Sequence, residues 1–330
     1  MRATTTAALL SLSLIASGTQ EAPHRADQSA SIMSVKVNSA ARSVEVQKMG
    51  LTGQGVIVAI IDTGIDASHP DLAGAVIDEA CFTANRGCPN GASQQFGEGS
   101  ARDDNGHGTH VAGVIAGRGK TAPEGLAPNT RIVAVKIAAA DGSTSTQAMI
   151  AALRWLAKSH PEVQVINMSL GTTATYSGVC DSASPITSAL RQAGDAARSQ
   201  GAVIVAAAGN EGQTDRMSAP ACVTGFLSVG AVHAEKGSIS ANGCTDLKTA
   251  ADRVACFSNS SSSLDILAPG AGIVSADLGG GKTNRSGTSQ AAAVVSGAVA
   301  LLLEGAPGTG SRIDAALFAS GAAIDAELAG

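Results

Sequence analysis

Short apolar runs alternate with stretches of helical periodicity from residue 56 onward, and this alternation restricts the folds open to the chain. The runs cover residues 56–62, 131–137, 163–170, 202–209, 226–232 and 264–270. Helical patterns begin near His107, Thr146, Pro185 and Ser289. Continuous apolar strands that alternate with helices are typical of a parallel sheet with helices on both faces. The sequence therefore predicts an α/β fold of three layers, α/β/α, around a mostly parallel, doubly wound central sheet.

The composition fits one domain with a substantial core. Of 330 residues, 44% are hydrophobic and 15% charged, a balance that argues against disorder. Aromatic residues make up only 2%, and there are 39 glycines, so aliphatic side chains and close backbone contacts must build the core. Residues 44–330 are interpreted as this domain, and the polar, unpatterned residues 19–43 as a leader or linker.

The first residues resemble an export signal. Arg2 precedes a mildly apolar stretch, residues 7–16, and the small residues at 16–18 suit cleavage. We therefore predict a signal peptide over residues 1–18 and a secreted or periplasmic protein, with a disordered tail as the alternative.

Cysteine usage agrees with export. The six cysteines are neighbours in sequence as Cys81 with Cys88, Cys180 with Cys222, and Cys244 with Cys256. None forms a CxxC motif, so nearest-neighbour disulfides are the hypothesis, with buried free thiols as the alternative. Disulfides persist in oxidising compartments.

Charge gives no sign of a polyanionic partner. The net charge is −5, and Lys and Arg are scattered rather than clustered. Nucleic acids and anionic membranes are bound by basic patches, so we expect neither as a partner. Apart from the N-terminal stretch, no segment is expected to span a membrane. We expect a monomer.

Asp62 ends the first apolar run, in the stretch IIDTG. Open α/β sheets bind their ligands at the carboxyl ends of the strands, where this acid is expected to lie. The simpler interpretation is a turn aspartate. An aspartic protease would need a second Asp-Thr-Gly or Asp-Ser-Gly, which the chain lacks, and an all-β fold.

His107 lies between glycines at the expected start of a helix, in DDNGHGTH. It could act as a base there, or simply cap or pack the helix. His107 and His110 could also form a metal pair, but a zinc site needs a third ligand and usually the HExxH pattern, which is absent. We therefore expect no metal at this pair.

Asn210 and Ser289 occupy two further turns of the predicted sheet. Asn210 follows an apolar strand in AAAGNEG, and Ser289 opens the last long helix in SGTSQAA. A serine hydroxyl becomes a nucleophile only when a base removes its proton and a third group orients that base. Asp62 and His107 could fill those two roles, and the Asn210 amide could donate to a developing oxyanion.

Chain order separates the candidate folds. An α/β-hydrolase places its histidine after the serine, but the last histidine here is His233, and GTSQA lacks the GxSxG elbow. The order Asp62, His107, Ser289 is instead the order of subtilisin.

Taken together, these stretches resemble the subtilisin-like serine proteases, the subtilase family, over residues 44–320. The matching motifs are Asp-Thr-Gly at 62, His-Gly-Thr-His-Val-Ala-Gly at 107, Asn-Met-Ser-Leu-Gly at 167, Ala-Ala-Gly-Asn-Glu-Gly at 207 and Gly-Thr-Ser at 287. The resemblance implies a serine endopeptidase in which Asp62 orients His107, His107 is the general base and then acid, Ser289 is the nucleophile, and Asn210 is the oxyanion donor. Polypeptides would be its substrates.

The resemblance also implies a substrate groove. Ser169, Leu170 and Gly171 would line one side of the primary specificity pocket, and Ala207, Ala208 and Gly209 the other. An extended peptide would lie along the first side and against Gly142 and Ser143, held by main-chain hydrogen bonds. Ser218, near Asp215 and Arg216, would close the pocket, which suggests small or medium apolar side chains.

The chain departs from the family's pattern at several positions. Gln290 stands where many members carry methionine, and Ala293 replaces a helix proline. The loop GRGKTAPEG from 117 lacks the side-chain oxygens of a strong calcium site, although Asp71 could supply one ligand. We therefore expect no cofactor.

Residues 19–43 are also few for the folding propeptide of secreted members. The alternative function is a catalytically impaired, peptide-binding relative in which the altered residues 290–293 misplace the serine.

Overall fold

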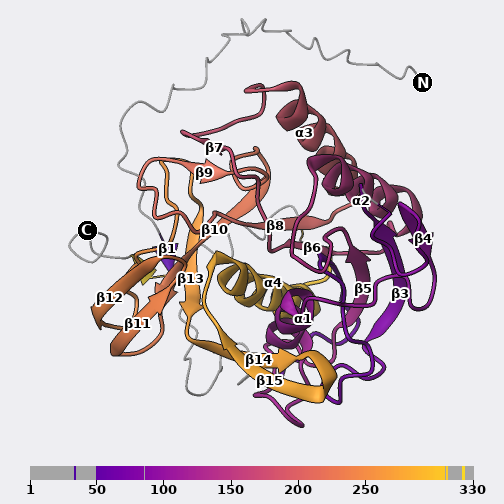
Figure 1. Ribbon diagram of the computed structural model, residues 1–330, viewed down its shortest axis with the longest axis horizontal. Helices are drawn as coiled ribbons and strands as arrows, with labels where there is room; N and C mark the ends of the chain where they lie inside the picture. Colours follow the sequence, from indigo (N-terminus) through magenta and orange to yellow (C-terminus); the bar gives the residue numbers. More distant parts are fainter. Residues whose placement is uncertain (1–32, 35–49, 85, 309, 311–321, 324–330) are drawn as a thin grey trace, which may run out of the picture.

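The computed structural model describes residues 33–34, 50–84, 86–308, 310 and 322–323. The predicted signal peptide, residues 1–18, lies outside the described residues, as does most of the predicted leader. Figure 1 shows a central sheet with helices packed on its two faces.

The large sheet has the order β16-β1-β13-β10-β8-β6-β2-β5-β3-β4. Its strands are β1 (Met33–Ser34), β2 (Ile57–Asp62), β3 (Val76–Phe82), β4 (Gln94–Phe96), β5 (Arg131–Lys136), β6 (Val165–Met168), β8 (Val203–Ala207), β10 (Phe226–His233), β13 (Ile266–Ala271) and β16 (Ala322–Ala323). Within the described residues, the strands at the two ends of this order, β4 and β16, pair antiparallel to their neighbours, and every pairing between them is parallel. The mostly parallel α/β/α sheet is therefore confirmed.

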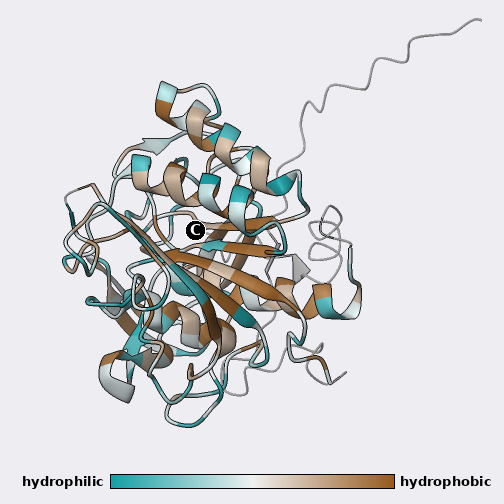
Figure 2. Cartoon of the chain, turned by 90° about the vertical axis from the view of Figure 1, so that its right-hand side faces the viewer, coloured by the Kyte–Doolittle hydropathy of each residue, from teal (hydrophilic) through white to brown (hydrophobic). Residues whose placement is uncertain are grey.

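Four helices cover the sheet among the described residues: α1 (His107–Ala116), α2 (Thr146–Ser159), α3 (Pro185–Arg198) and α4 (Thr288–Gly305). The alternating residues of β2 divide the core into two layers. Val58 and Ile60 pack with α1 and α4, whereas Ile57, Ala59 and Ile61 pack with α2 and α3. In Figure 2 the apolar strands run between these helical layers.

The two helical layers begin differently. Ser145 caps α2, and Ser184 forms a capping box with Thr187 at the start of α3. In contrast, α1 and α4 begin after Gly106 and Gly287, and neither glycine has a side chain to cap the helix. The first N–H groups of such a helix remain available to other partners. Both glycine-initiated helices start at the same edge of the sheet, beyond its carboxyl ends.

α4 is the one helix of the described chain whose length and mean hydropathy would allow it to cross a membrane, and 83% of that stretch is buried in the protein. This apolar helix belongs to the core, where it packs against β6, β8, β10 and β13 (Figure 1).

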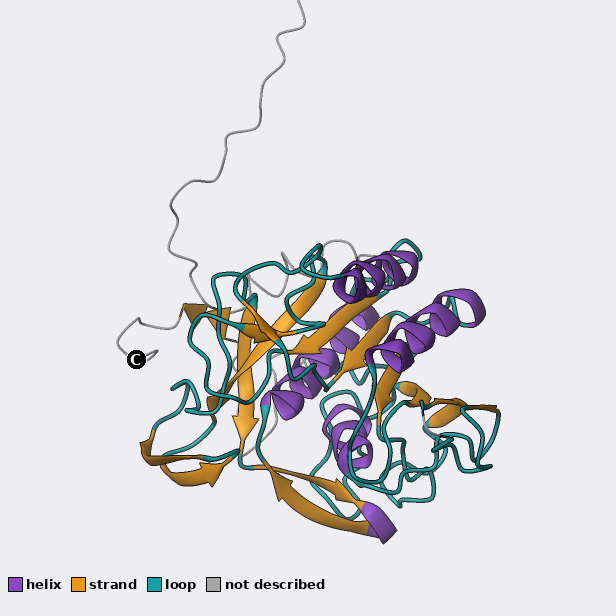
Figure 3. Ribbon diagram, turned by 45° about the horizontal axis from the view of Figure 1, so that its top comes forward, coloured by secondary structure: helices purple, strands orange, loops and turns teal. Residues whose placement is uncertain are grey.

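Among the described residues, three small two-stranded sheets lie outside the large sheet, and the β14–β15 hairpin extends from the main body (Figures 1 and 3). They pair β7 (Thr175–Tyr176) with β9 (Met217–Ser218), β11 (Gly237–Ala241) with β12 (Cys244–Thr249), and β14 (Ile273–Asp277) with β15 (Gly281–Arg285). A short 3₁₀ turn, Leu278–Gly280, forms the tip of the last hairpin.

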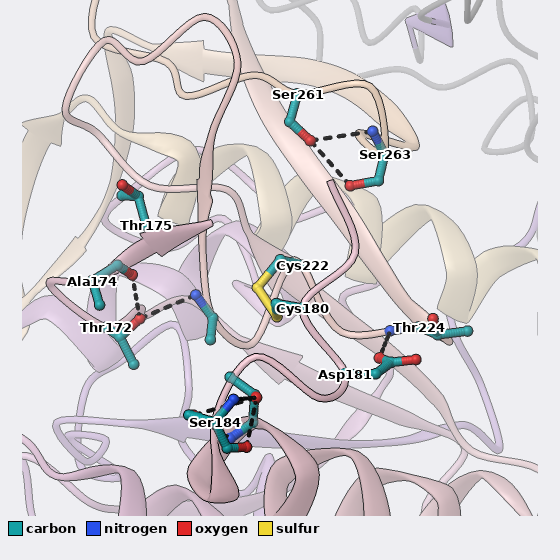
Figure 4. Close-up of a disulfide and its surroundings, with 12 residues drawn as sticks. Thr172, Ala174, Thr175, Cys180, Asp181, Ser184, Cys222, Thr224, Ser261 and Ser263 are labelled. Carbon is teal, nitrogen blue, oxygen red and sulfur yellow. Dashed lines mark hydrogen bonds between the residues drawn. A yellow bond between two sulfur atoms is a disulfide. The ribbon is translucent and has the colours of Figure 1, made fainter. Parts of the chain in front are cut away.

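Disulfides join Cys81 to Cys88, Cys180 to Cys222 and Cys244 to Cys256, which confirms the predicted pairing. Figure 4 shows Cys180–Cys222 holding two loops together. Close by, Thr224 N donates to Asp181 Oδ1 at 2.8 Å, and Ala219 N donates to Thr172 Oγ1 at 3.1 Å. These contacts fix the loop that follows β6 against the loop around β9.

Candidate active site

The candidate site lies where β2 ends and where α1 and α4 begin. Asp62 is the last residue of β2, His107 is the first residue of α1, and Ser289 is the second residue of α4. Strand ends and helix starts of this kind form the ligand-binding edge of open α/β sheets. Three residues far apart in sequence are thus carried to one edge by separate rigid elements.

Asp62 and His107 form the tightest contact of the site. His107 Nδ1 lies 2.7 Å from Asp62 Oδ1, and the aspartate side chain is 2% exposed. A buried carboxylate accepts a proton-bearing nitrogen, so Nδ1 carries the hydrogen and Nε2 keeps its lone pair. Glycine is required at 108, where a Cβ would lie 2.0 Å from the Gly64 carbonyl oxygen. This close approach brings the start of α1 against the end of β2.

The Asp62 carboxylate raises the pKa of His107. Asp62 Oδ1 also accepts Thr63 N at 2.7 Å, but Oδ2 is buried and has no hydrogen-bond partner in the described part of the chain. Burial lowers the pKa of His107, while the Asp62 charge and hydrogen bond raise it, and the net pKa is above the ordinary value of 6.5. The imidazole is therefore a better base than an isolated histidine.

Ser289 is held by reciprocal bonds to Ser169. Ser289 Oγ donates to the Ser169 carbonyl oxygen at 3.0 Å, and Ser169 Oγ donates to the Ser289 carbonyl oxygen at 2.7 Å. Ser169 Oγ in turn accepts Asn167 Nδ2, and Ser296 Oγ donates to Asn167 Oδ1, each at 2.9 Å. This buried chain ties β6 to the first three turns of α4. Sequence reasoning placed Ser169 in a pocket wall and missed its contact with Ser289.

Asn210 has one side-chain atom fixed and one available. Its Oδ1 accepts Thr288 N at 2.8 Å and Thr288 Oγ1 at 3.1 Å. These donors orient the amide, so that Nδ2 is the remaining donor, and no described residue accepts from it. The arrangement leaves two donors, Asn210 Nδ2 and the Ser289 N–H at the uncapped start of α4, on residues that line one cavity.

A cavity of about 200 Å³ opens beside Ser289. It is lined by Leu170, Gly171, Thr172, Ala207, Gly209, Asn210, Glu211, Ser218, Thr288 and Ser289. Of the predicted wall residues, Leu170, Gly171, Ala207 and Gly209 line it; Ala208 is buried beside it, and Ser169 contacts Ser289 instead.

The floor and rim of this cavity differ in part from expectation. Ser218 lines it and is 1% exposed, and a Cβ on Gly171 would lie 2.8 Å from Ser218 Cβ. Asp215 and Arg216 are not among the lining residues, whereas Glu211 is, a carboxylate that sequence reasoning did not single out. Its Oε2 accepts Asn259 Nδ2 at 2.5 Å.

Gly142 and Ser143 lie apart from this cavity, on an exposed turn closed by the bond from Gly142 N to Ala139 O at 2.9 Å. Asn105 Nδ2 donates to the neighbouring Ala140 carbonyl oxygen at 2.9 Å. The turn is therefore tied to the loop that leads into His107.

His110 and Gln290 form a neutral contact under the site. His110 Nε2 donates to the Ile273 carbonyl oxygen at 3.1 Å, and Gln290 Nε2 lies 3.5 Å from His110 Nδ1. Burial lowers the pKa of His110 to about 3. His110 is thus a neutral core residue. Its ring contacts Ile273 and Gln290, whereas the His107 ring contacts Asp62, so the two imidazoles do not face a shared metal position.

The residues around Asp71 do not fit a calcium ion. Asp71 is fully buried, and both carboxylate oxygens accept hydrogen bonds from the loop 120–122. The donors are Lys120 N, Thr121 N at 3.1 Å, Thr121 Oγ1 at 2.7 Å and Ala122 N at 2.8 Å. Calcium requires several oxygen ligands, whereas this carboxylate is surrounded by N–H and O–H donors. Burial raises the pKa of Asp71, but these bonds outweigh it and lower the pKa.

Comparison with known proteins agrees with this geometry. The family model described as "Subtilase family" matches residues 53–320. Subtilisin DY from Bacillus licheniformis is 36% identical over 80% of this chain and 82% of its own length. Subtilisin-like protease 1 from Trichophyton tonsurans is 35% identical over 78% of this chain, which spans only 43% of that protein.

Solved structures agree as well. A cold adapted subtilisin-like serine proteinase superposes with a TM-score of 0.61 at 29% identity, covering 80% of this chain and 81% of the other. Sphericase superposes with a TM-score of 0.65 at 29% identity, covering 82% and 84%. The chain therefore belongs to the subtilase family of serine proteases, as its sequence motifs had predicted.

Proposed function

We propose that the chain is a secreted endopeptidase that cleaves peptide bonds through an acyl-enzyme on Ser289. The observation that carries the proposal is the 2.7 Å bond between His107 Nδ1 and Asp62 Oδ1, at the same sheet edge as the start of α4. That bond leaves Nε2 as the basic nitrogen, and a serine needs such a base to react.

The proposed reaction uses these residues in turn. Ser289 Oγ attacks the carbonyl carbon of the substrate and passes its proton to His107 Nε2, after turning away from the Ser169 carbonyl. Asn210 Nδ2 and Ser289 N donate to the negative oxygen that forms. His107 then protonates the leaving amine as the C–N bond breaks, which leaves the acyl ester. Water, deprotonated by His107, releases the acid and restores Ser289.

The cavity supports a preference for small or medium apolar side chains on the acyl side of the cleaved bond. Its volume is about 200 Å³, and the buried Ser218 lies at its floor. Glu211 at the lining disfavours an acidic side chain by repulsion. The extended substrate would run along residues 169–171 and the turn at Gly142–Ser143.

The experiment is cleavage of peptides blocked at both ends, with the residue before the scissile bond varied. Cleavage inside the peptides, best after Ala, Leu or Met, is the expected result. Binding without cleavage would instead identify the impaired peptide-binding relative. No cleavage of the blocked peptides, together with release of single residues from the same peptides left unblocked, would exclude an endopeptidase.

The pH dependence of kcat/KM is predicted from His107. Its neutral form is the base, and Asp62 raises its pKa above 6.5, so activity falls as pH drops through that raised pKa. We expect an acid limb with its midpoint above 6.5, measured on a neutral peptide so that only the enzyme titrates. A midpoint clearly below 6.5 would contradict the assigned base.

Resistance to peroxide is predicted from Gln290. This buried side chain occupies a position beside Ser289 where a thioether would be oxidised to a polar sulfoxide. Activity is expected to survive mild peroxide, whereas the Gln290→Met variant should lose activity under the same treatment. Equal loss in parent and variant would place the sensitive group elsewhere.

Independence from calcium is predicted at Asp71, because its oxygens are already bonded to the loop 120–122. Because calcium is not expected to bind there, the Tm measured by calorimetry should be the same in excess calcium and in EDTA. A bound cation would be detected, since at a hundred times its Kd it would add about 2.7 kcal/mol to the free energy of unfolding. The Asp71→Asn variant should lose about 1–3 kcal/mol in either buffer, because one acceptor becomes a donor facing N–H groups. A Tm that rises with calcium only in the parent would contradict this.

The proposed location of the protein outside the cytoplasm rests on its disulfides. Three disulfides support an extracellular or periplasmic protein. That the protein is a monomer, with neither nucleic acid nor membrane as a partner, remains a prediction.

A further inference from the structure

A buried carboxylate, Asp103, lies in the loop just before α1 and contacts none of the reacting atoms. It is 7% exposed. Its Oδ1 accepts Thr63 Oγ1 at 2.9 Å, Asn105 N at 3.0 Å and Gly106 N at 3.0 Å, and its Oδ2 accepts Thr109 N at 3.0 Å and Thr109 Oγ1 at 2.6 Å. Burial raises the pKa of Asp103, but these bonds lower it overall, so the group is a carboxylate at neutral pH.

These bonds connect the strand that ends in Asp62 to the helix that begins with His107. Thr63 directly follows Asp62, and its hydroxyl donates to Asp103 while it accepts Gly108 N at 2.9 Å. Gly108 directly follows His107. The residues that follow Asp62 and His107, which are Thr63 and Gly108, are therefore joined through the Thr63 hydroxyl, and the Asp103 carboxylate holds that hydroxyl. We call these contacts of Asp103, Thr63 and Gly108 the bridge.

Side chains from outside the helix accept the first N–H groups of α1: Asn105 Oδ1 accepts His107 N at 3.1 Å, and Thr63 Oγ1 accepts Gly108 N at 2.9 Å. Gly106 precedes it with φ of 94°, a left-handed conformation that suits glycine, and offers no side-chain acceptor. Asp103 accepts the next N–H, that of Thr109, the third residue of the helix. Asp103 also accepts Asn105 N and Thr63 Oγ1, so the three capping residues form one network around its carboxylate.

We propose that Asp103, acting through Thr63 and Thr109, is the positioning residue that holds His107 against Asp62. This inference rests on the proposed function, because it assigns Asp103 a part in the work of that triad. A shift of about 1 Å in a catalytic group can lower a rate by about a hundredfold, so the bridge has a large effect on turnover without touching the substrate.

The chain contains a matched control. Asp71, like Asp103, is a buried carboxylate whose two oxygens accept backbone and threonine donors, but its partners lie in the loop 120–122. Asp103→Asn and Asp71→Asn each place an amide against N–H groups, so both should lower Tm to a similar extent. Below both melting temperatures, only the loss at Asp103 should reach the active site.

For Asp103→Asn we expect kcat to fall about 10- to 100-fold with KM within about twofold. The acid limb of kcat/KM should also move to lower pH, because the charge of Asp103 raises the pKa of His107. The other charged groups that face His107, Asp62 on β2 and Arg285 on β15, are unchanged in this variant. Asp71→Asn should keep the kcat and the pH profile of the parent.

A second pair of variants removes the bridge without changing charge. Thr63→Val deletes the hydroxyl between Asp103 and Gly108 at nearly equal volume, and Thr63→Ser retains it. We expect Thr63→Val to lower kcat about tenfold with an unaltered acid limb, and Thr63→Ser to restore it. This pair also decides the matter if Asp103→Asn fails to fold.

Two results would overturn the inference: unchanged kcat and pH profile in Asp103→Asn, or equal kcat in Thr63→Val, Thr63→Ser and the parent. A parent that hydrolyses no peptide would instead contradict the proposed function, and the positioning role with it.

Discussion

Replacement of Ser289 by alanine is expected to abolish peptide hydrolysis. Without the hydroxyl no acyl ester can form, and kcat should fall roughly a million-fold, the order of magnitude known for this residue in subtilisin. The Cβ of alanine fits the same site, so α4 should stay in place. The side-chain bond to the Ser169 carbonyl is lost, whereas the Ser169 bond to the backbone of residue 289 remains.

The measurement is burst and steady-state kinetics on a peptide ester and a peptide amide, with the parent as reference. Equal KM for the parent and Ser289→Ala, together with the loss of kcat, would show an intact groove. Residual hydrolysis within tenfold of the parent would mean that another group carries the reaction.

The Asp62→Asn variant should lose about 10⁴ in kcat. The amide can offer its N–H to His107 Nδ1, which favours the imidazole tautomer with its hydrogen on Nε2, where the base is needed. The pKa of His107 should also fall, because the negative charge and hydrogen bond that raise it are removed. We expect the acid limb of the residual activity to lie below that of the parent.

Asp71→Asn is the control for this variant, since it removes another buried carboxylate away from His107. NMR of the imidazole protons would report the tautomer and the pKa directly. If Asp62→Asn kept the parent's kcat and acid limb, Asp62 would not be the residue that orients the base.

The sheet could be predicted because its central strands are continuous apolar runs. The predicted runs at 56–62 and 202–209 contain β2 and β8, and the other four contain or overlap their strands closely. β3 was not predicted, since Asp78 and Glu79 interrupt its apolar pattern. The hairpin β11–β12 was not predicted either; its residues are mostly exposed and follow no apolar alternation.

The sequence could predict which residues form the candidate site and at which edge of the sheet they lie. Asp62, Asn210 and Ser289 each follow a strand or open a helix, and parallel strands end at one edge, so the sequence places them together. What it could not show is which side chains hold them. Asp103 reads as an ordinary turn acid in DDNG, and the contact between Ser169 and Ser289 joins residues whose separation in sequence gives no signal.

The pocket shows the same limit. Ser218 could be placed at its floor by resemblance, but the lining by Glu211 depends on how the loop after β8 turns, which the bond from Asn259 Nδ2 fixes. Side-chain direction in a loop is set by such tertiary contacts rather than by local pattern.

The central claim is that Ser289 is an activated nucleophile, and covalent labelling with a fluorophosphonate tests it most directly. The parent, Ser289→Ala and Asp71→Asn would be treated with the probe, and the labelled peptide mapped by mass spectrometry. We predict one label per molecule, confined to the peptide that contains Ser289, present in the parent and Asp71→Asn and absent in Ser289→Ala. A folded parent that takes up no label, or a label that persists in Ser289→Ala, would contradict the account.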